Sequence, residues 1–213
     1  MIRSTPLTRR RLVATAASTA LIAAAGPAVA ALLPTPRQTT GPFCPLTKPV
    51  DSDADLVTVA GRPGPAKGTV THVIGRVLDP GGRPVADARV EIWQCDALGA
   101  YHHPRDGGGI DPGFQGYGRM DAGDDGTYRF RTIRPVPYPG RTPHIHFAVT
   151  ARGFPPLTTQ MYVAGEPGNG RDFVLRRITD PQARAAVIVA LEPAPDIEAG
   201  ALLGVFDIVL GNA

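Results

Sequence analysis

Two histidines and one arginine stand close together in a segment typical of a β-strand. His144 and His146 are separated by a single residue in the run RTPHIHFAVT, and Arg141 precedes His144 by three positions. Side chains two positions apart on a strand point to the same face of a sheet. The two imidazoles can therefore face one metal ion, and these residue types predict a metal site.

Two histidines alone do not hold a metal ion firmly, so further ligands are expected. A His-x-His pair with one carboxylate suits zinc or ferrous iron. Two tyrosines also stand nearby: Tyr138 lies six residues before His144, and Tyr101 follows the segment that contains Trp93. A phenol releases its proton near pH 10 in water. Tyrosine ligands would therefore require a strongly Lewis-acidic cation, of which ferric iron is an example.

The elements that must position these residues are short strands. Alternating apolar runs flank a turn at residues 79–82, which predicts antiparallel strands on both sides of it. Further strands are predicted in residues 126–133, 144–151, 157–165 and 200–211. Glycine and proline separate these segments, and helical periodicity is scarce. The pattern predicts an all-β fold, an antiparallel β-sandwich.

One short helix is expected near the C-terminus. The run TDPQARAAVIVAL offers Thr179 or Asp180 as an N-cap and places Pro181 in the first turn, which is the arrangement that favours a helix start. Residues 31–67 are rich in proline, threonine and aspartate and predict an extended N-terminal arm over the domain surface. Residues 68–213 form the predicted sandwich domain.

The first 30 residues resemble an export signal. Arginines at positions 9–11 precede an alanine-rich apolar run that ends in an Ala-x-Ala pattern at residues 28–30, as expected for a cleaved signal peptide. The Thr-Arg-Arg sequence at residues 8–10 resembles a twin-arginine signal, with an ordinary Sec signal as the alternative. We therefore expect a protein exported to the periplasm or the extracellular space, by the twin-arginine route.

Removal of residues 1–30 changes the charge of the chain. The segment contains four arginines and no acid, so the 22 basic side chains fall to 18 against 19 acidic ones, a net charge of −1. No basic, aromatic-interleaved stretch remains to predict nucleic-acid binding, and no second apolar segment approaches membrane-spanning length. Homo-oligomerisation stays open. So does a disulfide between Cys44 and Cys95, which could pair in an oxidising compartment.

Four segments in chain order resemble a known family. They are QTTGPF (residues 38–43), GRVLDPGGRPVADARVEIWQCDALGAY (75–101), GTYRFRTIRPVPYPGRTPHIHF (126–147) and LTTQMY (157–162). Together they resemble the signatures of the intradiol ring-cleavage dioxygenases, the family of protocatechuate and catechol dioxygenases. The short YPGRTPHIH connection is most similar to that of the secreted single-chain branch.

The resemblance implies a role for each matching residue. It implies a non-haem Fe(III) held by Tyr101, Tyr138, His144 and His146, with Tyr138 also acting as a base. It implies that Arg141 offsets negative charge on the substrate ring and that Gln160 lies beside the substrate. It also implies substrate-pocket positions at Thr39, Gly41, Pro42 and Trp93.

The implied reaction uses O2 to cleave a catechol ring between the two hydroxyl-bearing carbons, giving a muconate-type dicarboxylic acid. The metal would polarise and orient the substrate. The chain contains no glycine-rich dinucleotide fingerprint, so no nicotinamide or flavin is expected. Gly140 and Phe43–Cys44 depart from positions where many relatives carry tryptophan and tyrosine, so the substrate stays open among catechol, protocatechuate, hydroxyquinol and larger lignin-derived aromatics.

Two interpretations from other classes remain. The run GRVLDPGGRPVADARVEIW also resembles transthyretin-like sandwich modules that have no catalytic role. A zinc hydrolase could combine the histidine pair with Asp106 or Asp111, although no H-E-x-x-H motif supports it. The remaining aromatic candidates have structural interpretations: His102 and His103 as solvated loop residues, and Tyr117, Tyr128 and Tyr162 as packing residues.

Overall fold

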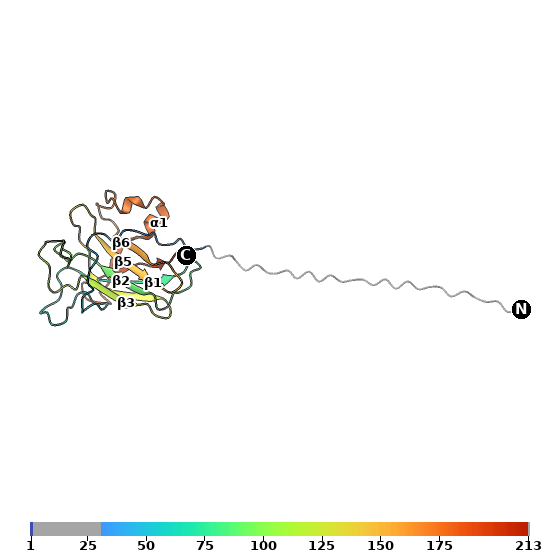
Figure 1. The fold of residues 1–213 in the computed structure, drawn as a ribbon, viewed down its shortest axis with the longest axis horizontal. Helices are drawn as coiled ribbons and strands as arrows, with labels where there is room; N and C mark the ends of the chain where they lie inside the picture. Colours follow the sequence, from blue (N-terminus) through green and yellow to red (C-terminus); the bar gives the residue numbers. More distant parts are fainter. Residues whose placement is uncertain (2–30, 213) are drawn as a thin grey trace.

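The computed structural model describes Met1 and residues 31–212, so the predicted signal peptide lies outside the described residues apart from Met1. The described chain folds into two five-stranded sheets with one short α-helix and one 3-10 turn. The all-β fold class is therefore confirmed (Figure 1). Within the described residues, no helix has the length and apolar character needed to cross a membrane.

The first sheet is built around the longest strand, β1 (Val70–Leu78). β4 (Thr127–Ile133) pairs antiparallel with one edge of β1 along most of its length. The other edge of β1 pairs in parallel with β9 (Leu202–Val205) and then with β10 (Ile208–Val209). β8 (Leu191–Pro193) completes the sheet beside β9.

The second sheet has the strand order β3-β2-β5-β6-β7. Its strands are β3 (Tyr117–Asp121), β2 (Arg89–Trp93), β5 (His144–Thr150), β6 (Leu157–Val163) and β7 (Ile188–Val189). All pairs in this sheet are antiparallel except β6 with β7. Most pairs of the sandwich are thus antiparallel, as predicted, and the parallel pairs are those of β7 with β6 and of β9 and β10 with β1.

The turn at residues 79–82 forms, but the strands on its two sides do not pair with each other. Gly82 N donates to Asp79 O at 2.9 Å, and Val85 N donates to Val77 O at 2.9 Å. The chain then crosses to the second sheet, where β2 pairs with β3 and β5. Because β4 and β9 occupy both edges of β1, the following strand has no free edge there.

The main core lies between the sheets, and it decides which face of β5 is free for chemistry. Ile145, Phe147 and Val149 are fully buried members of that core. Successive side chains of a strand point to opposite faces, so His144 and His146 lie on the face of the second sheet that is turned away from the main core. A separate cluster on that side contains the buried residues Trp93, Cys95, Tyr101 and Tyr117.

Two short helical elements and the arm frame this outer face. α1 (Pro181–Ala186) begins as expected, with the Asp180 side chain accepting from Ala183 N at 2.8 Å. η1 (Leu175–Arg177) follows the loop after β6. Residues 31–67 carry no named helix or strand. Backbone hydrogen bonds fix this arm to the sandwich, among them Gln38 N to Thr158 O at 2.7 Å.

Candidate metal centre and active site

The register of the second sheet places three functional candidates in one row. Trp93 on β2 lies opposite His146 on β5, and His146 lies opposite Gln160 on β6. In the next row, His144 lies opposite Tyr162. Directly opposed residues of antiparallel strands share a face, so these five side chains project together toward the arm. The sheet itself therefore brings the predicted ligand pair beside Trp93 and Gln160.

Two loops add the tyrosines to the histidine pair. Tyr101 follows β2, and Tyr138 lies between β4 and β5. Their rings meet edge to face with centroids 5.5 Å apart. Tyr138 lies 5.5 Å from His144, His144 lies 4.9 Å from His146, and Tyr101 lies 6.3 Å from His146, all between ring centroids. The four rings therefore form a closed circuit of contacts.

The two imidazoles turn the same nitrogen toward each other. His144 Nε2 and His146 Nε2 are 3.2 Å apart. The other nitrogen of His144, Nδ1, lies 2.7 Å from Thr142 O, and a carbonyl oxygen can only accept, so Nδ1 carries the proton. That tautomer leaves the lone pair of His144 Nε2 free to bind a cation.

His146 is packed closely on two sides. The ring of Trp93 stacks on it with centroids 4.9 Å apart and an interplanar angle of 5°. Gly41 of the arm has a φ of +70°, and a Cβ added there would lie 3.2 Å from Cε1 and 3.5 Å from Nε2 of His146. A glycine is therefore required both by the backbone conformation and by the close approach of the arm to the imidazole.

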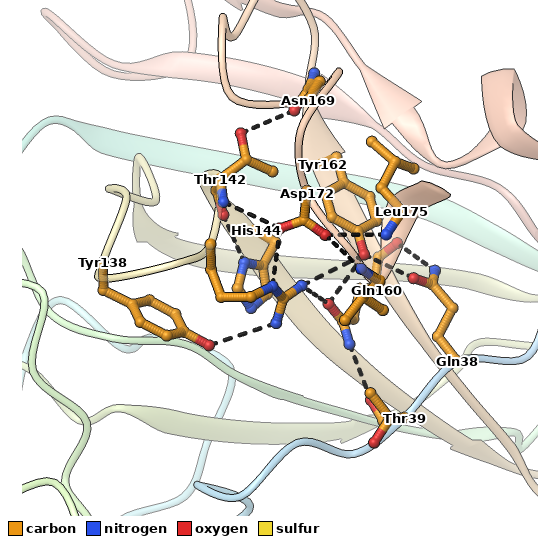
Figure 2. A network of polar contacts seen from close by, with 12 residues as sticks. Gln38, Thr39, Tyr138, Thr142, His144, Gln160, Tyr162, Asn169, Asp172 and Leu175 are labelled. Carbon is orange, nitrogen blue, oxygen red and sulfur yellow. Dashed lines mark hydrogen bonds and ion pairs between the residues drawn. The ribbon is translucent and has the colours of Figure 1, made fainter. Parts of the chain in front are cut away.

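Arg141 is buried and lies at the edge of the four rings. Its Nε donates to Asp172 Oδ2 at 2.8 Å, its Nη2 donates to Gln160 Oε1 at 2.6 Å, and its Nη1 lies 3.4 Å from the Tyr138 hydroxyl. Its two terminal nitrogens therefore contact Tyr138 and Gln160, while Asp172 holds its Nε; Figure 2 labels these three partners. The positive charge is thus directed at Tyr138 and at the space beside Gln160.

A second group of hydrogen bonds ties the arm to this edge. Gln160 Nε2 donates to Thr39 O at 2.9 Å, and the Tyr162 hydroxyl donates to Gln38 Oε1 at 2.7 Å. These contacts fix the Gln160 amide with its oxygen toward Arg141, as Figure 2 shows for the labelled partners. Pro42 lies between Gly41 and Phe43, and the Phe43 ring stacks on Tyr101 at 5.0 Å.

Burial keeps all four rings uncharged when no cation is present. It raises the pKa of Tyr101 well above its usual value, and the neighbouring Tyr138 acts in the same direction. Burial lowers the pKa of His146 well below its usual range and that of His144 to about 4. The pKa of Tyr138 is also raised by burial, but here the positive charge of Arg141 opposes the effect.

The donor set fits a trivalent metal ion better than zinc. In the described residues, no group of three or more histidine, cysteine, aspartate or glutamate side chains could hold a metal. The hydroxyl of Tyr101 is buried without a hydrogen-bond partner there, and burying an unpaired polar group is costly. A cation that binds both Nε2 atoms and the phenols would satisfy these groups, and phenolate donors favour a strongly Lewis-acidic ion.

Comparison with known proteins gives the family. A family model described as Dioxygenase matches residues 40–212. The chain is 39% identical to the protocatechuate 3,4-dioxygenase beta chain of Burkholderia cepacia, over 74% of this chain and 71% of that one. It is 36% identical to the hydroxyquinol 1,2-dioxygenase of Corynebacterium glutamicum, over 54% of this chain. The chain belongs to the intradiol ring-cleavage dioxygenase family.

A solved structure agrees with this membership. The dioxygenase domain of a dioxygenase and carbohydrate-binding protein fusion from Streptomyces sp. SirexAA-E is 34% identical, with a TM-score of 0.64, and the match covers 84% of this chain and 99% of that domain. The alignment spans only 43% of the hydroxyquinol dioxygenase. Membership of an enzyme family favours the dioxygenase over the non-catalytic transthyretin-like module.

One expectation for the loops of this dioxygenase is wrong, and two alternatives that the sequence left open are not supported. His103 is buried and His102 half-buried, because the loop folds back over the aromatic cluster. Asp106 accepts from Tyr101 N at 3.1 Å and Asp111 from Lys67 N at 2.7 Å, so both carboxylates already serve backbone N–H groups. They do not complete a zinc site. Cys44 and Cys95 are both free thiols.

Sequence reasoning missed three polar contributors to the site. Tyr162 packs in the core as expected, and its hydroxyl also contacts Gln38 and Gln160. Its position two residues after Gln160 on the same strand face was a usable signal. Asp172 and Thr142 gave no such signal, because their roles depend on a loop that returns to β5 from a distant part of the chain.

Proposed function

We propose that this dioxygenase binds one ferric ion through Tyr101, Tyr138, His144 and His146 and uses it to cleave a catechol with O2. The ring would open between the two hydroxyl-bearing carbons, and both oxygen atoms of O2 would enter a muconate-type dicarboxylic acid. The closed circuit of four ring contacts, with the two Nε2 atoms 3.2 Å apart, is the observation that carries the proposal.

The ferric ion, when bound, would lower the pKa of the coordinating phenols and withdraw electron density from a bound catecholate. The chain supplies what the ion cannot. Thr142 O selects the tautomer of His144, and Trp93 and Gly41 fix the ring plane of His146. Such outer contacts orient metal ligands and raise their affinity.

Tyr138 is the phenol best suited to accept a proton from the substrate. It is half-buried, whereas Tyr101 is 3% exposed. The Arg141 guanidinium lies 3.4 Å from its hydroxyl and stabilises negative charge on it. A half-exposed phenol beside a fixed cation could hold a substrate proton without exposing the rest of the site to water.

Arg141 and Gln160 would orient the substrate ring. Arg141 Nη2 and Gln160 Oε1 are hydrogen-bonded at 2.6 Å, so the guanidinium is held in one plane beside the site. Fixed donors that face developing negative charge act more strongly in a buried site than in water. The guanidinium would therefore favour electron-rich states of the catecholate.

The substrate class follows from the relatives. Those reported above are named for protocatechuate and hydroxyquinol, both of which are substituted catechols. We therefore propose a small catechol-type substrate together with O2.

Iron reconstitution tests this function. Protein loaded with Fe(III) should absorb visible light through phenolate-to-iron charge transfer, consume O2 with catechols and release a dicarboxylic acid. Tyr101→Phe should shift or abolish the absorption band. Tyr128→Phe is the matched control, because Tyr128 is buried in the other sheet and bonds Phe206 O. The proposal would be contradicted by a colourless iron-loaded protein. It would also be contradicted by a product whose ring is opened next to the two hydroxyl-bearing carbons rather than between them.

We also propose export by the twin-arginine route, on the sequence of residues 1–30 alone. Replacing Arg9, Arg10 and Arg11 together by lysine keeps the basic charge but removes the arginine pair. The variant should remain inside the cell while the wild-type protein is recovered outside the cytoplasm. Unchanged export would favour a Sec signal, which needs only positive charge.

A further inference from the structure

One buried carboxylate outside the predicted ligand set has all its hydrogen-bonding capacity directed to the site and to one turn. Asp172 is 2% exposed and lies in the loop between β6 and η1. Its Oδ2 accepts from Arg141 Nε at 2.8 Å and from Thr142 N at 3.1 Å. Its Oδ1 accepts from Val174 N at 3.0 Å and from Leu175 N at 2.9 Å. Oδ2 thus contacts the site, and Oδ1 contacts the turn of η1.

The Oδ2 contact determines how Arg141 meets the site. A guanidinium is planar, so a hydrogen bond at Nε fixes the directions of both terminal nitrogens. With Nε held by Asp172, Nη1 points to Tyr138 and Nη2 to Gln160. The carboxylate is also the partner that offsets the cost of burying the Arg141 charge, because an unpaired buried charge is strongly destabilising.

The same oxygen reaches the histidine pair by a second route. Thr142 N donates to Asp172, and Thr142 O accepts from His144 Nδ1 at 2.7 Å. Thr142 Oγ1 also donates to Asn169 Oδ1 at 2.9 Å, as Figure 2 shows. The loop after β6 therefore holds the peptide that selects the His144 tautomer.

We propose that Asp172 is a positioning residue of this dioxygenase, which holds the Arg141 guanidinium toward the substrate and fixes the Thr142 carbonyl on His144. The inference rests on the proposed function for its effect on catalysis, but the structural hold on Arg141 stands apart from it. The Oδ1 contacts show why the carboxylate does not move: they attach it to the first backbone N–H groups of the η1 turn.

Asp172→Asn separates the two roles of the carboxylate. The amide oxygen can still accept from Val174 and Leu175, so the turn keeps its cap. The amide nitrogen would then face two donors, Arg141 Nε and Thr142 N, and could accept from neither. Asp180→Asn is the matched control, because Asp180 caps α1 through Ala183 N and, in the part of the chain that the structure describes, makes no hydrogen bond or ion pair with Arg141 or Thr142.

The first measurement needs neither iron nor substrate. In ¹H–¹⁵N spectra of the iron-free protein, the Nε–H signal of Arg141, assigned by its loss in Arg141→Lys, should be shifted and protected from exchange. Asp172→Asn should abolish that protection, and Asp180→Asn should leave it. A signal that stays protected at its wild-type position in Asp172→Asn would overturn the proposal, whatever the protein catalyses.

The second measurement is a double-mutant cycle on the iron-loaded enzyme. Misplacement of catalytic groups and loss of outer contacts typically cost 10- to 100-fold, so kcat of Asp172→Asn should fall by about 10- to 100-fold, with a smaller change in KM. In an Arg141→Ala background the same substitution should lower kcat by a clearly smaller factor, because only the route through Thr142 and His144 is still lost. Fully multiplicative effects would overturn the proposal. If the wild-type enzyme opens no catechol, the proposed function fails while the spectra still test Asp172.

Discussion

The indole of Trp93 lies parallel to the imidazole of His146, with an interplanar angle of 5° and centroids 4.9 Å apart. The two residues are opposite partners of β2 and β5, so the sheet register, rather than a loop, creates the stack. Each side chain is almost fully buried. The flat contact therefore fixes the plane in which His146 offers Nε2.

Trp93→Leu should weaken iron binding without unfolding the sandwich. The branched side chain cannot support the imidazole plane, and loss of an outer contact typically lowers metal affinity by about 10- to 100-fold. Trp93→Phe retains an aromatic face and should lose much less. Competition with a coloured chelator measures both affinities, and equal affinities for Leu and Phe variants would show that the stack does not orient the ligand.

Gly41→Ala should affect iron binding through contact, beyond its backbone strain. The residue has a φ of +70°, and the added Cβ would lie 3.2 Å from His146 Cε1. Left-handed backbone costs a non-glycine residue about 1–2 kcal/mol. Gly153→Ala is the control, since Gly153 has a φ of +83° but no atom within 4 Å of the added Cβ. Both variants should lose stability in urea titrations, and only Gly41→Ala should also bind iron less tightly.

The site could be predicted from the sequence where it depends on strand periodicity. His144 and His146 share a face because they are two residues apart on β5, and Gln160 and Tyr162 repeat the same spacing on β6. Tyr101 and Tyr138 have no such local relation, so their approach to the histidines followed from the family resemblance. The contacts of the two tyrosine rings with each other and with the histidine rings depend on how the loops fold in three dimensions.

The pairing of strands was less predictable than their positions. The turn at residues 79–82 formed as expected, yet it joins strands of different sheets. Turn chemistry is local, whereas the choice of sheet depends on which edges distant strands such as β4 and β9 occupy. Asp172 shows the same limit: a lone aspartate in a loop carries no periodicity, and its partner Arg141 lies 31 residues away.

Arg141→Lys should lower kcat more than it raises KM. Lysine keeps the positive charge but cannot donate to Asp172 and Gln160 in the fixed geometry of a guanidinium. Loss of one oriented donor to developing negative charge costs about 100- to 1000-fold in kcat in other enzymes. Steady-state kinetics with a saturating catechol measure the effect. A full wild-type kcat would mean that charge alone, without orientation, suffices.

The acid stability of the fold should depend on a cluster far from the site. Arg131 donates to Glu198 through Nε at 2.8 Å and Nη2 at 2.6 Å, and His72 Nε2 lies 3.0 Å from the same carboxylate. The hydrogen bonds from Arg131 lower the pKa of Glu198 to about 2. In the unfolded chain a glutamate has a pKa of about 4.3, so the folded state holds the proton less readily.

The sign of the pH dependence follows from this difference. A lowered folded-state pKa gives stability that is complete above about pH 4.3 and is lost as the pH falls toward about 2. Since the pair is partly exposed, its contribution should be about 1 kcal/mol or less. Glu198→Gln should therefore be less stable than the wild type at pH 6, and the gap should close at pH 2.5. Glu192→Gln, at an exposed position of β8, is the control. Urea unfolding midpoints at pH 6 and pH 2.5 measure the stability difference between each variant and the wild type. A difference for Glu198→Gln that stays the same at both pH values would contradict the prediction.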